Sequence, residues 1–245
     1  MARGITSKLS PMNNKTFESG KEFKPKVKVE IEPGYNDFIP QEFKQNPLSY
    51  FESKGKNIKT GEVKRDETGR VREDPTAVKE LPVWTNANGE ELKTIGKRVD
   101  IRKGKVGESG DPFYEYKILK IINEIGLPAP KPVAKIEQEA SHLIIMEKVF
   151  GVGWYEKDSL NLPEKGYSAE DIENLKKQAE EQMRALAQEF ERAGIKRNWK
   201  LKDMIFVLDL DSKSVLRIIP TDWERTKIDY EKLEEYKNKK VTKPV

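Results

Sequence analysis

Residues 196–203 of the chain read Lys196-Arg197-Asn198-Trp199-Lys200-Leu201-Lys202-Asp203. A second polar segment lies further along the chain, Thr221-Asp222-Trp223-Glu224. Between these segments, residues 204–208 and 215–219 are rich in apolar and β-branched side chains, and residues 209–214 carry turn-forming Asp and Ser. The pattern predicts a β-hairpin that connects the two polar segments.

A long amphipathic helix is predicted before this loop. It begins at Ser168, whose hydroxyl can cap the first turn, and Asp171 completes a capping box. Gly194 ends it. Its apolar residues recur at intervals of three and four and therefore share one face: Ile172, Leu175, Ala179, Met183, Leu186 and Phe190. A charged helix over residues 229–238 is predicted to follow the hairpin.

The middle of the chain has the pattern of a packed sheet with one helix. Asn88-Gly89 lies between two apolar runs and predicts a hairpin, because both residues tolerate positive φ. Further strands are predicted over residues 98–102, 132–137 and 143–147. A helix is predicted from Asp111, which can act as its N-cap, to Gly126.

Residues 1–80 differ from the rest of the chain. Turn residues recur there and apolar residues are sparse, which predicts an extended polar arm. Residues 26–32 are the exception, because charged and apolar side chains alternate strictly there. In a strand this alternation would place Val27, Val29 and Ile31 on one face. Such a strand could join a sheet edge of a partner protein or dock on its own domain, and the sequence leaves both interpretations open.

The composition excludes several kinds of site. The chain has no Cys, which rules out disulfides and thiolate metal sites, and its one histidine, His142, leaves little material for zinc sites or Ser-His-Asp catalysis. A net charge of +4 from 46 basic and 42 acidic residues does not by itself imply a nucleic-acid partner. No apolar run approaches the roughly 20 residues of a membrane span. We expect a cytoplasmic protein with no membrane partner, or a virion-associated one if its source is viral.

The expected order of elements is strands, a helix, two strands, a Gly-containing connection, a long helix, a polar loop, a hairpin and an Asp-bearing segment. This order, and the H-x-D-x-x-x-x-N spacing of residues 196–203, resemble the protein-kinase-like family, especially small bacterial and viral kinases in which D-W-E replaces D-F-G. The resemblance covers residues 81–228. It implies an α+β, two-lobed fold, with a sheet-plus-helix N-lobe over residues 81–150 and a shortened helical C-lobe over residues 151–245.

The resemblance also implies roles for individual residues. Glu115 matches the helix Glu that forms an ion pair near the phosphates of ATP. Glu147 and Lys148 lie in the segment that joins the lobes, whose backbone normally binds the adenine. Asp222 matches the Asp that holds Mg²⁺, and Asp203 stands in the place of a metal-binding Asn, so both offer oxygen ligands that Mg²⁺ prefers. ATP and Mg²⁺ are the implied cofactors.

Three positions depart from the family pattern. Asn198 stands where the catalytic base is expected, and an amide is not basic at neutral pH. Arg102 stands where the strand V-A-I-K would supply its phosphate-binding Lys. The first hairpin has one glycine, Gly89, instead of a glycine-rich cover for phosphates. Asp203 could replace the missing catalytic group, hold the metal, or cap the turn before the next strand.

Three functions remain as hypotheses. The preferred one is a pseudokinase, a binding or structural module that its N-terminal arm anchors to a protein partner in a larger assembly. The first alternative is an active, divergent Mg-ATP-dependent phosphotransferase that uses Asp203 and Asp222. The second is a nucleic-acid-associated or virion structural protein in which basic residues of the arm make the contact.

Overall fold

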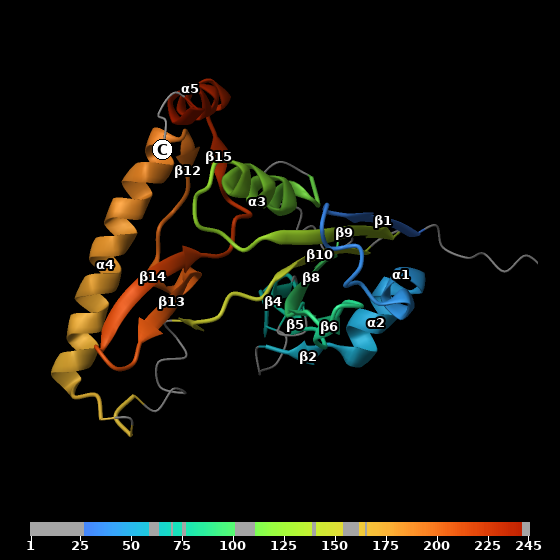
Figure 1. Cartoon of the computed structure of the whole chain (residues 1–245), viewed down its shortest axis with the longest axis horizontal. Coiled ribbons are helices and arrows are strands. Elements are labelled where there is room, and N and C mark those ends of the chain that lie inside the picture. The colour runs from blue at the N-terminus through green and yellow to red at the C-terminus, as the bar shows by residue number, and fades with distance from the viewer. Residues whose placement is uncertain are drawn as a thin grey trace, which may run out of the picture.

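The computed structural model describes residues 27–58, 64–69, 71–74, 77–100, 111–138, 141–153, 162–164 and 166–241. Within these residues the chain combines helices and antiparallel sheets. Figure 1 shows a larger sheet with three helices around it on one side, and a smaller sheet covered by a long helix on the other. None of the helices in the described ranges has the length and apolar character needed to cross a bilayer.

Six antiparallel strands form the larger sheet. They are β1 (Val27–Ile31), β2 (Lys56–Asn57), β5 (Val78–Glu80), β8 (Thr94–Asp100), β9 (Pro132–Gln138) and β10 (Ser141–Glu147). Their order across the sheet is β1-β9-β10-β8-β5-β2. Two small hairpins accompany the sheet, formed by β3 (Lys64–Arg65) with β4 (Val71–Glu73) and by β6 (Trp84–Thr85) with β7 (Glu91–Leu92). The second confirms the predicted hairpin, and Gly89 in its turn has φ +81°.

Helices lie against both faces of this sheet. Because side chains of a strand alternate between faces, Ile144 and Met146 of β10 pack with helix α3 (Tyr114–Glu124). Leu143 and Ile145 point to the opposite face, where they pack with α1 (Gln41–Gln45) and α2 (Pro47–Lys54). The larger sheet is therefore buried on both sides, and α3 is fixed against one of them.

Part of the N-terminal segment belongs to the packed fold and is not an extended arm. Strand β1 pairs with β9 of the same chain over all five of its residues, so this strand docks on its own domain. Helices α1 and α2 bury Phe43, Tyr50 and Phe51 against the sheet. Their few apolar side chains are large and all point inward, which is why sparse hydrophobicity misled the prediction. Residues 1–26 lie outside the described ranges.

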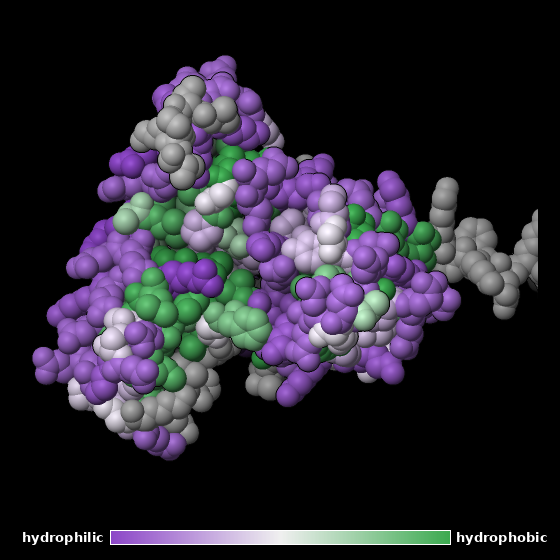
Figure 2. Space-filling model, viewed as in Figure 1, coloured by the Kyte–Doolittle hydropathy of each residue, from purple (hydrophilic) through white to green (hydrophobic). Residues whose placement is uncertain are grey.

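The smaller sheet forms beside the larger one. It contains β11 (Val152–Gly153), β13 (Met204–Asp209) and β14 (Ser214–Pro220), and helix α4 (Ala169–Arg192) packs on it. A two-stranded pair, β12 (Ile195–Lys196) with β15 (Lys227–Ile228), then leads into α5 (Tyr230–Val241). Figure 2 shows apolar side chains gathered over β13 and β14, while hydrophilic ones cover the outer side of α4.

Three of the four predicted ends of the main helices are confirmed; the exception is the start of α3, where the N-cap is Phe113 and not Asp111. Ser168 and Asp171 form a reciprocal capping box at the start of α4. Gly194 follows the helix with φ +75°, and Gly126 follows α3 with φ +69°. Asp111 accepts a hydrogen bond from the Phe113 N–H at 2.8 Å just before α3. These local signals place both helices without reference to the rest of the fold.

Gly96 allows α2 to approach the larger sheet. A Cβ atom at this position of β8 would lie 2.8 Å from the Phe51 ring and 3.3 Å from Ile145. Real Cβ atoms do not approach other atoms as closely as 2.8 Å. The absence of a side chain at Gly96 therefore lets Phe51 seat directly on the strand that also carries Lys97.

We expect Gly96→Ala to destabilise the protein by about 1–3 kcal/mol, because the methyl group overpacks this contact. In a strand with free space for a methyl group, the same change would stabilise the protein by roughly 0.5–1 kcal/mol. A loss of stability would therefore identify overpacking. Urea unfolding followed by tryptophan fluorescence measures the effect. In a Phe51→Leu background the cost of Gly96→Ala should fall by at least about 1 kcal/mol. An equal cost in both backgrounds would contradict the proposed contact.

Candidate functional site

Lys97 lies at the centre of a charged cluster on the α3 side of the larger sheet. On β8 it stands between Ile95 and Val99, which both pack with the α3 cluster, so the alternation of the strand turns Lys97 to the same side. Its Nζ is 2.6 Å from Oε2 of Glu115 on α3 and 2.7 Å from Oε1 of Glu224. The Lys97 and Glu115 side chains are 17% and 7% exposed. The two ion pairs thus connect β8, α3 and the loop that follows β14.

The surroundings of Lys97 stabilise its charged form. Burial acts to lower the pKa of Lys97, but the charges of Glu115, Glu224 and Asp222 outweigh burial and raise the pKa above the usual value for lysine. Lys97 is therefore a permanent cation at neutral pH. Its position and charge suit it to bind an anionic group.

Glu115 also fixes the segment that follows β14. Its second carboxylate oxygen, Oε1, accepts a hydrogen bond from the Trp223 N–H at 3.3 Å. Because Glu115 is nearly buried, the loss of either partner would leave a desolvated charge without compensation. One glutamate side chain thus sets the distance between β8, α3 and residues 221–224.

Asp203 and Asp222 lie at the same end of the β13–β14 hairpin. Met204 pairs with Pro220 at the open end of the hairpin, which places the next residue outward on each strand side by side. The Thr221 N–H and hydroxyl donate to the Asp203 carbonyl oxygen at 2.8 and 3.0 Å. The predicted meeting of the two polar segments is therefore present in the structure.

The backbone at Asp222 is in a conformation that few residues adopt. Its φ is +60°, in the left-handed region, where Asp occurs more readily than most non-glycine residues. Such a conformation costs of order 1–3 kcal/mol and persists only where neighbouring contacts enforce it. Here the bonds of Thr221 to Asp203 and of Trp223 to Glu115 enforce it from both sides. The backbone of Asp222, which is an exposed residue, is consequently held in a defined place.

Arg197 is a second cation within the site. Its Nη2 donates to the Thr221 carbonyl oxygen at 2.8 Å, and its guanidinium lies 4.4 Å from the ring centre of Trp223. Burial lowers the pKa of Arg197, and the charges of Asp203, Asp222 and Glu115 act in the opposite direction. Two of its nitrogens, Nε and Nη1, are buried with no hydrogen-bond partner among the described residues.

Aromatic side chains pack the two polar segments against helix α4. Trp223 is 1% exposed and stacks on Phe190 of α4, with ring centres 5.3 Å apart. Trp199 contacts the same Phe190 ring edge-on, also at 5.3 Å. Both tryptophans therefore act as packing residues for the loops that carry them. Phe190 of α4 is therefore the ring against which both loops pack.

The structure brings only some of the predicted site residues together. Glu115, Asp203 and Asp222 come together as described above. Asn198 is exposed on the loop between β12 and the short helix Leu201–Asp203. Arg102 lies outside the described residues, and the described partner of Glu115 is Lys97.

Lys97 was missed because the strand was predicted to begin at residue 98, whereas β8 begins at Thr94. The signal that identifies it is the pattern of faces along β8. Ile95 and Val99 are apolar on the α3 side, and Lys97 is the charged residue between them. A lysine that shares the buried face of a strand needs an acidic partner, and Glu115 on the neighbouring helix supplies it.

Glu147 and Lys148 are engaged within the protein. The Glu147 N–H donates to the Lys131 carbonyl oxygen, and the Lys148 N–H to that of Lys93, each at 2.8 Å. The Glu147 side chain accepts from the Tyr35 hydroxyl at 2.6 Å. Both backbone N–H groups are therefore unavailable to an adenine in this conformation, and the two residues brace the end of β10.

The site offers a metal ion two carboxylates. Among the described residues, no group of three or more His, Asp or Glu side chains is arranged to hold a metal. Mg²⁺, however, is usually bound by one or two carboxylates together with the phosphates of its substrate. Asp203 and Asp222 are the candidates for that role, because their backbones lie at one end of the hairpin and both charges act on Arg197.

No protein-family model matches the sequence, and no curated protein matches it significantly. Among solved structures, the chain is similar to WaaP in complex with acyl carrier protein, with 15% identity, 87% of this chain and 78% of that chain covered, and a TM-score of 0.41.

Two further structures are similar to the chain. The BubR1 kinase domain is 12% identical to the chain, with a TM-score of 0.42; the match covers 81% of this chain and 63% of the BubR1 chain. The bifunctional kinase-methyltransferase WbdD is 13% identical to the chain, with a TM-score of 0.38; the match covers 63% of this chain and 31% of the WbdD chain. Because these scores and identities are low, the function of the chain has to follow from the geometry of its own residues.

Removal of the central cation should be costly. We expect Lys97→Met to lower the free energy of unfolding by about 3 kcal/mol, because it leaves the buried Glu115 carboxylate without its ion-pair partner. Lys131→Met is a matched control, since Lys131 is 63% exposed and 3.9 Å from Glu147, and it should cost less than about 1 kcal/mol. Urea unfolding measures both variants. Equal effects of the two substitutions would show that the Lys97 pair does not stabilise the fold.

Proposed function

We propose that this chain is a protein-kinase-like domain that binds a nucleoside triphosphate with Mg²⁺ but lacks the general base of an active phosphotransferase. The observation that carries the proposal is the contact of Lys97 with Glu115, at 2.6 Å, together with the charge of Asp222, which also acts on Lys97. Phosphoryl transfer sites need this combination, because they neutralise phosphate charge with a lysine and a metal ion.

Lys97 would bind phosphate oxygens of the nucleotide. It is the cation that Glu115 orients, and its charge persists at neutral pH. The presence of this lysine restores one feature that the sequence alone had placed at Arg102. Nucleotide binding is therefore better supported by the geometry than by the motif spacing.

Asp203 and Asp222 would hold the metal ion. Mg²⁺ supplies Lewis-acid neutralisation of the phosphates when it is bound. The contribution of this chain is to hold the backbones of both residues at the end of the β13–β14 hairpin, through the bonds of Thr221 to the Asp203 carbonyl oxygen. The positive φ of Asp222 fits such a role, since strained backbone is concentrated at functional sites.

The arrangement of the two sheets is compatible with a two-lobed domain. The larger sheet with α3 would form one lobe, and α4 with the β11-β13-β14 sheet the other. Lys97 and Glu115 come from the first part, and Asp203 and Asp222 from the second. The proposed nucleotide would bind where these two parts meet.

Asn198 argues for binding without efficient turnover. It occupies the loop position at which the family places its catalytic base, and a neutral amide cannot accept the proton of a substrate hydroxyl. We therefore place the chain among pseudokinases, which act as nucleotide-dependent binding or structural modules. The described part of the N-terminal segment serves the fold itself, since β1 is a strand of the larger sheet.

Nucleotide binding is tested by thermal unfolding. ATP with Mg²⁺, at about tenfold above its dissociation constant, should raise the Tm by about 3–5 °C. Asp222→Asn should abolish the shift because it removes a metal ligand. Asp211→Asn, which changes an exposed acid in the turn between β13 and β14, should leave the shift unchanged. If wild-type protein shows no shift at millimolar ATP with Mg²⁺, the proposed site does not exist.

The missing base is tested by restoring it. Wild-type protein should hydrolyse ATP at the background rate, and Asn198→Asp should raise this rate by roughly 100-fold, since a positioned general base contributes about that much or more. Phosphate release measures the rate, and Asn198→Ala is the control that should remain inactive. Wild-type turnover that Asp222→Asn abolishes would contradict the absence of a base and favour the active phosphotransferase.

A further inference from the structure

Lys97 is held by two carboxylates at once. The distances from its Nζ to Glu115 and Glu224 are 2.6 and 2.7 Å. A lysine ammonium has three N–H donors, so these contacts leave one of them for any other group. Since the Lys97 side chain is 17% exposed, a phosphate that binds there competes with groups already in place.

The two carboxylates differ in how firmly they are held. Glu115 is 7% exposed and also accepts the Trp223 N–H, so it cannot turn away without leaving two partners. The Glu224 side chain is 45% exposed and belongs to the loop between β14 and β15. Such a partly solvated pair contributes little to stability, typically about 0–1 kcal/mol, and can open at low cost. Glu224 is therefore the exchangeable partner of Lys97.

The local charges oppose a nucleotide that arrives without a metal. Within the described part of the chain, Lys97 and Arg197 are two cations on which the surrounding acids act. Glu115, Glu224, Asp203 and Asp222 supply more negative charge than these two cations neutralise. A triphosphate is itself highly negative, so Coulomb repulsion weakens its binding until a divalent cation is present.

We infer, resting on the proposed nucleotide site, that Glu224 occupies the place at Lys97 that a phosphate oxygen takes, and thereby makes nucleotide binding dependent on Mg²⁺. The contact acts as an internal competitor. Without metal, the Glu224 carboxylate keeps Lys97 and repels the phosphates. With Mg²⁺ bound, the excess negative charge is offset and the phosphates displace Glu224 toward solvent.

The test is Glu224→Gln, which keeps the size of the side chain and removes its charge. Calorimetric titration of the full chain with ATP, in EDTA and in excess Mg²⁺, measures both affinities. In EDTA the variant should bind ATP at least about tenfold more tightly than wild type, and with Mg²⁺ the two should agree within about threefold. Glu224→Asp, which keeps the charge, should bind weakly in EDTA, as wild type does.

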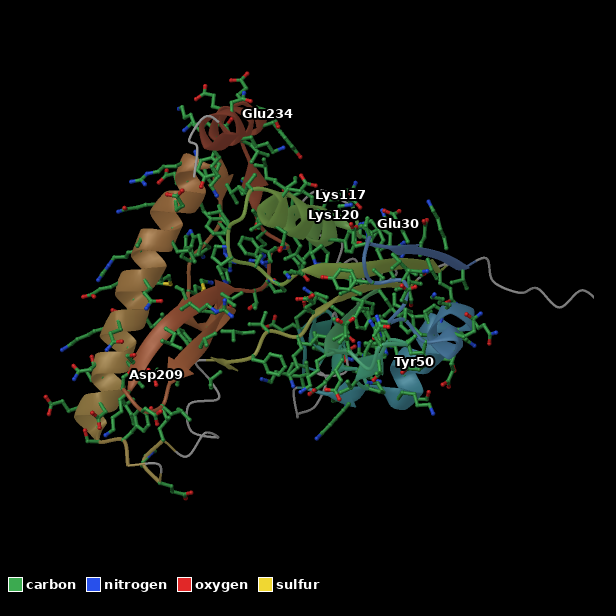
Figure 3. All side chains as sticks on the ribbon, in the orientation of Figure 1. Glu30, Tyr50, Lys117, Lys120, Asp209 and Glu234 are labelled. Carbon is green, nitrogen blue, oxygen red and sulfur yellow. The ribbon has the colours of Figure 1, made fainter. Side chains whose placement is uncertain are left out.

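Glu234→Gln is the matched control. Glu234 is a 64% exposed glutamate that also pairs with a lysine, Lys237, at 3.0 Å. Figure 3 shows it on α5, at the end of the molecule away from the hairpin. Its substitution should change neither affinity. An unfolding midpoint equal to that of wild type would show that each variant is folded.

Two results would overturn the inference while leaving the nucleotide site intact. One is an unchanged affinity of Glu224→Gln in EDTA, which would show that Glu224 does not compete. The other is a large loss of affinity of the same variant in Mg²⁺, which would make Glu224 a metal ligand instead. A failure of wild type to bind ATP even with Mg²⁺ is a distinct outcome, because it would overturn the proposed function and the inference together.

Discussion

The buried ion pair between Lys97 and Glu115 is the contact on which the rest of the site depends. It joins the larger sheet to α3, and the second oxygen of Glu115 extends the connection to Trp223. Because both side chains are largely withdrawn from water, neither can leave the other without a large desolvation cost. The pair therefore fixes the backbone of Trp223, the residue after Asp222, relative to β8 and α3.

Helix α3 carries half of this pair, and distant parts of the chain hold it in place. Near its start, the Tyr116 hydroxyl donates to Glu32, which follows β1, at 2.6 Å. At its end, Lys240 of α5 donates to the Ile125 carbonyl oxygen, also at 2.6 Å. Segments from both ends of the described chain thus converge on one helix. This gives the N-terminal strand a structural task that a flexible arm could not perform.

The site is organised for holding charge more than for moving a proton. Lys97, Glu115 and Arg197 are oriented by largely buried contacts, whereas Asn198, at the position of the expected base, is exposed and neutral. In the proposed function, these contacts would bind a nucleotide, whereas turnover would need a base that Asn198 does not supply.

Local sequence signals determined the elements that depend on local interactions. The capping box at Ser168, the glycine at 194 and the turn at 209–214 predicted α4 and the hairpin, because caps and turns are decided by neighbouring residues. The convergence of Asp203 and Asp222 followed from that hairpin. Tertiary structure alone decided which cation meets Glu115, since the register of β8 determines which side chain faces α3. It also decided that Phe43 and Phe51 are buried, because a sparse apolar segment becomes core only when a sheet face is there to receive it.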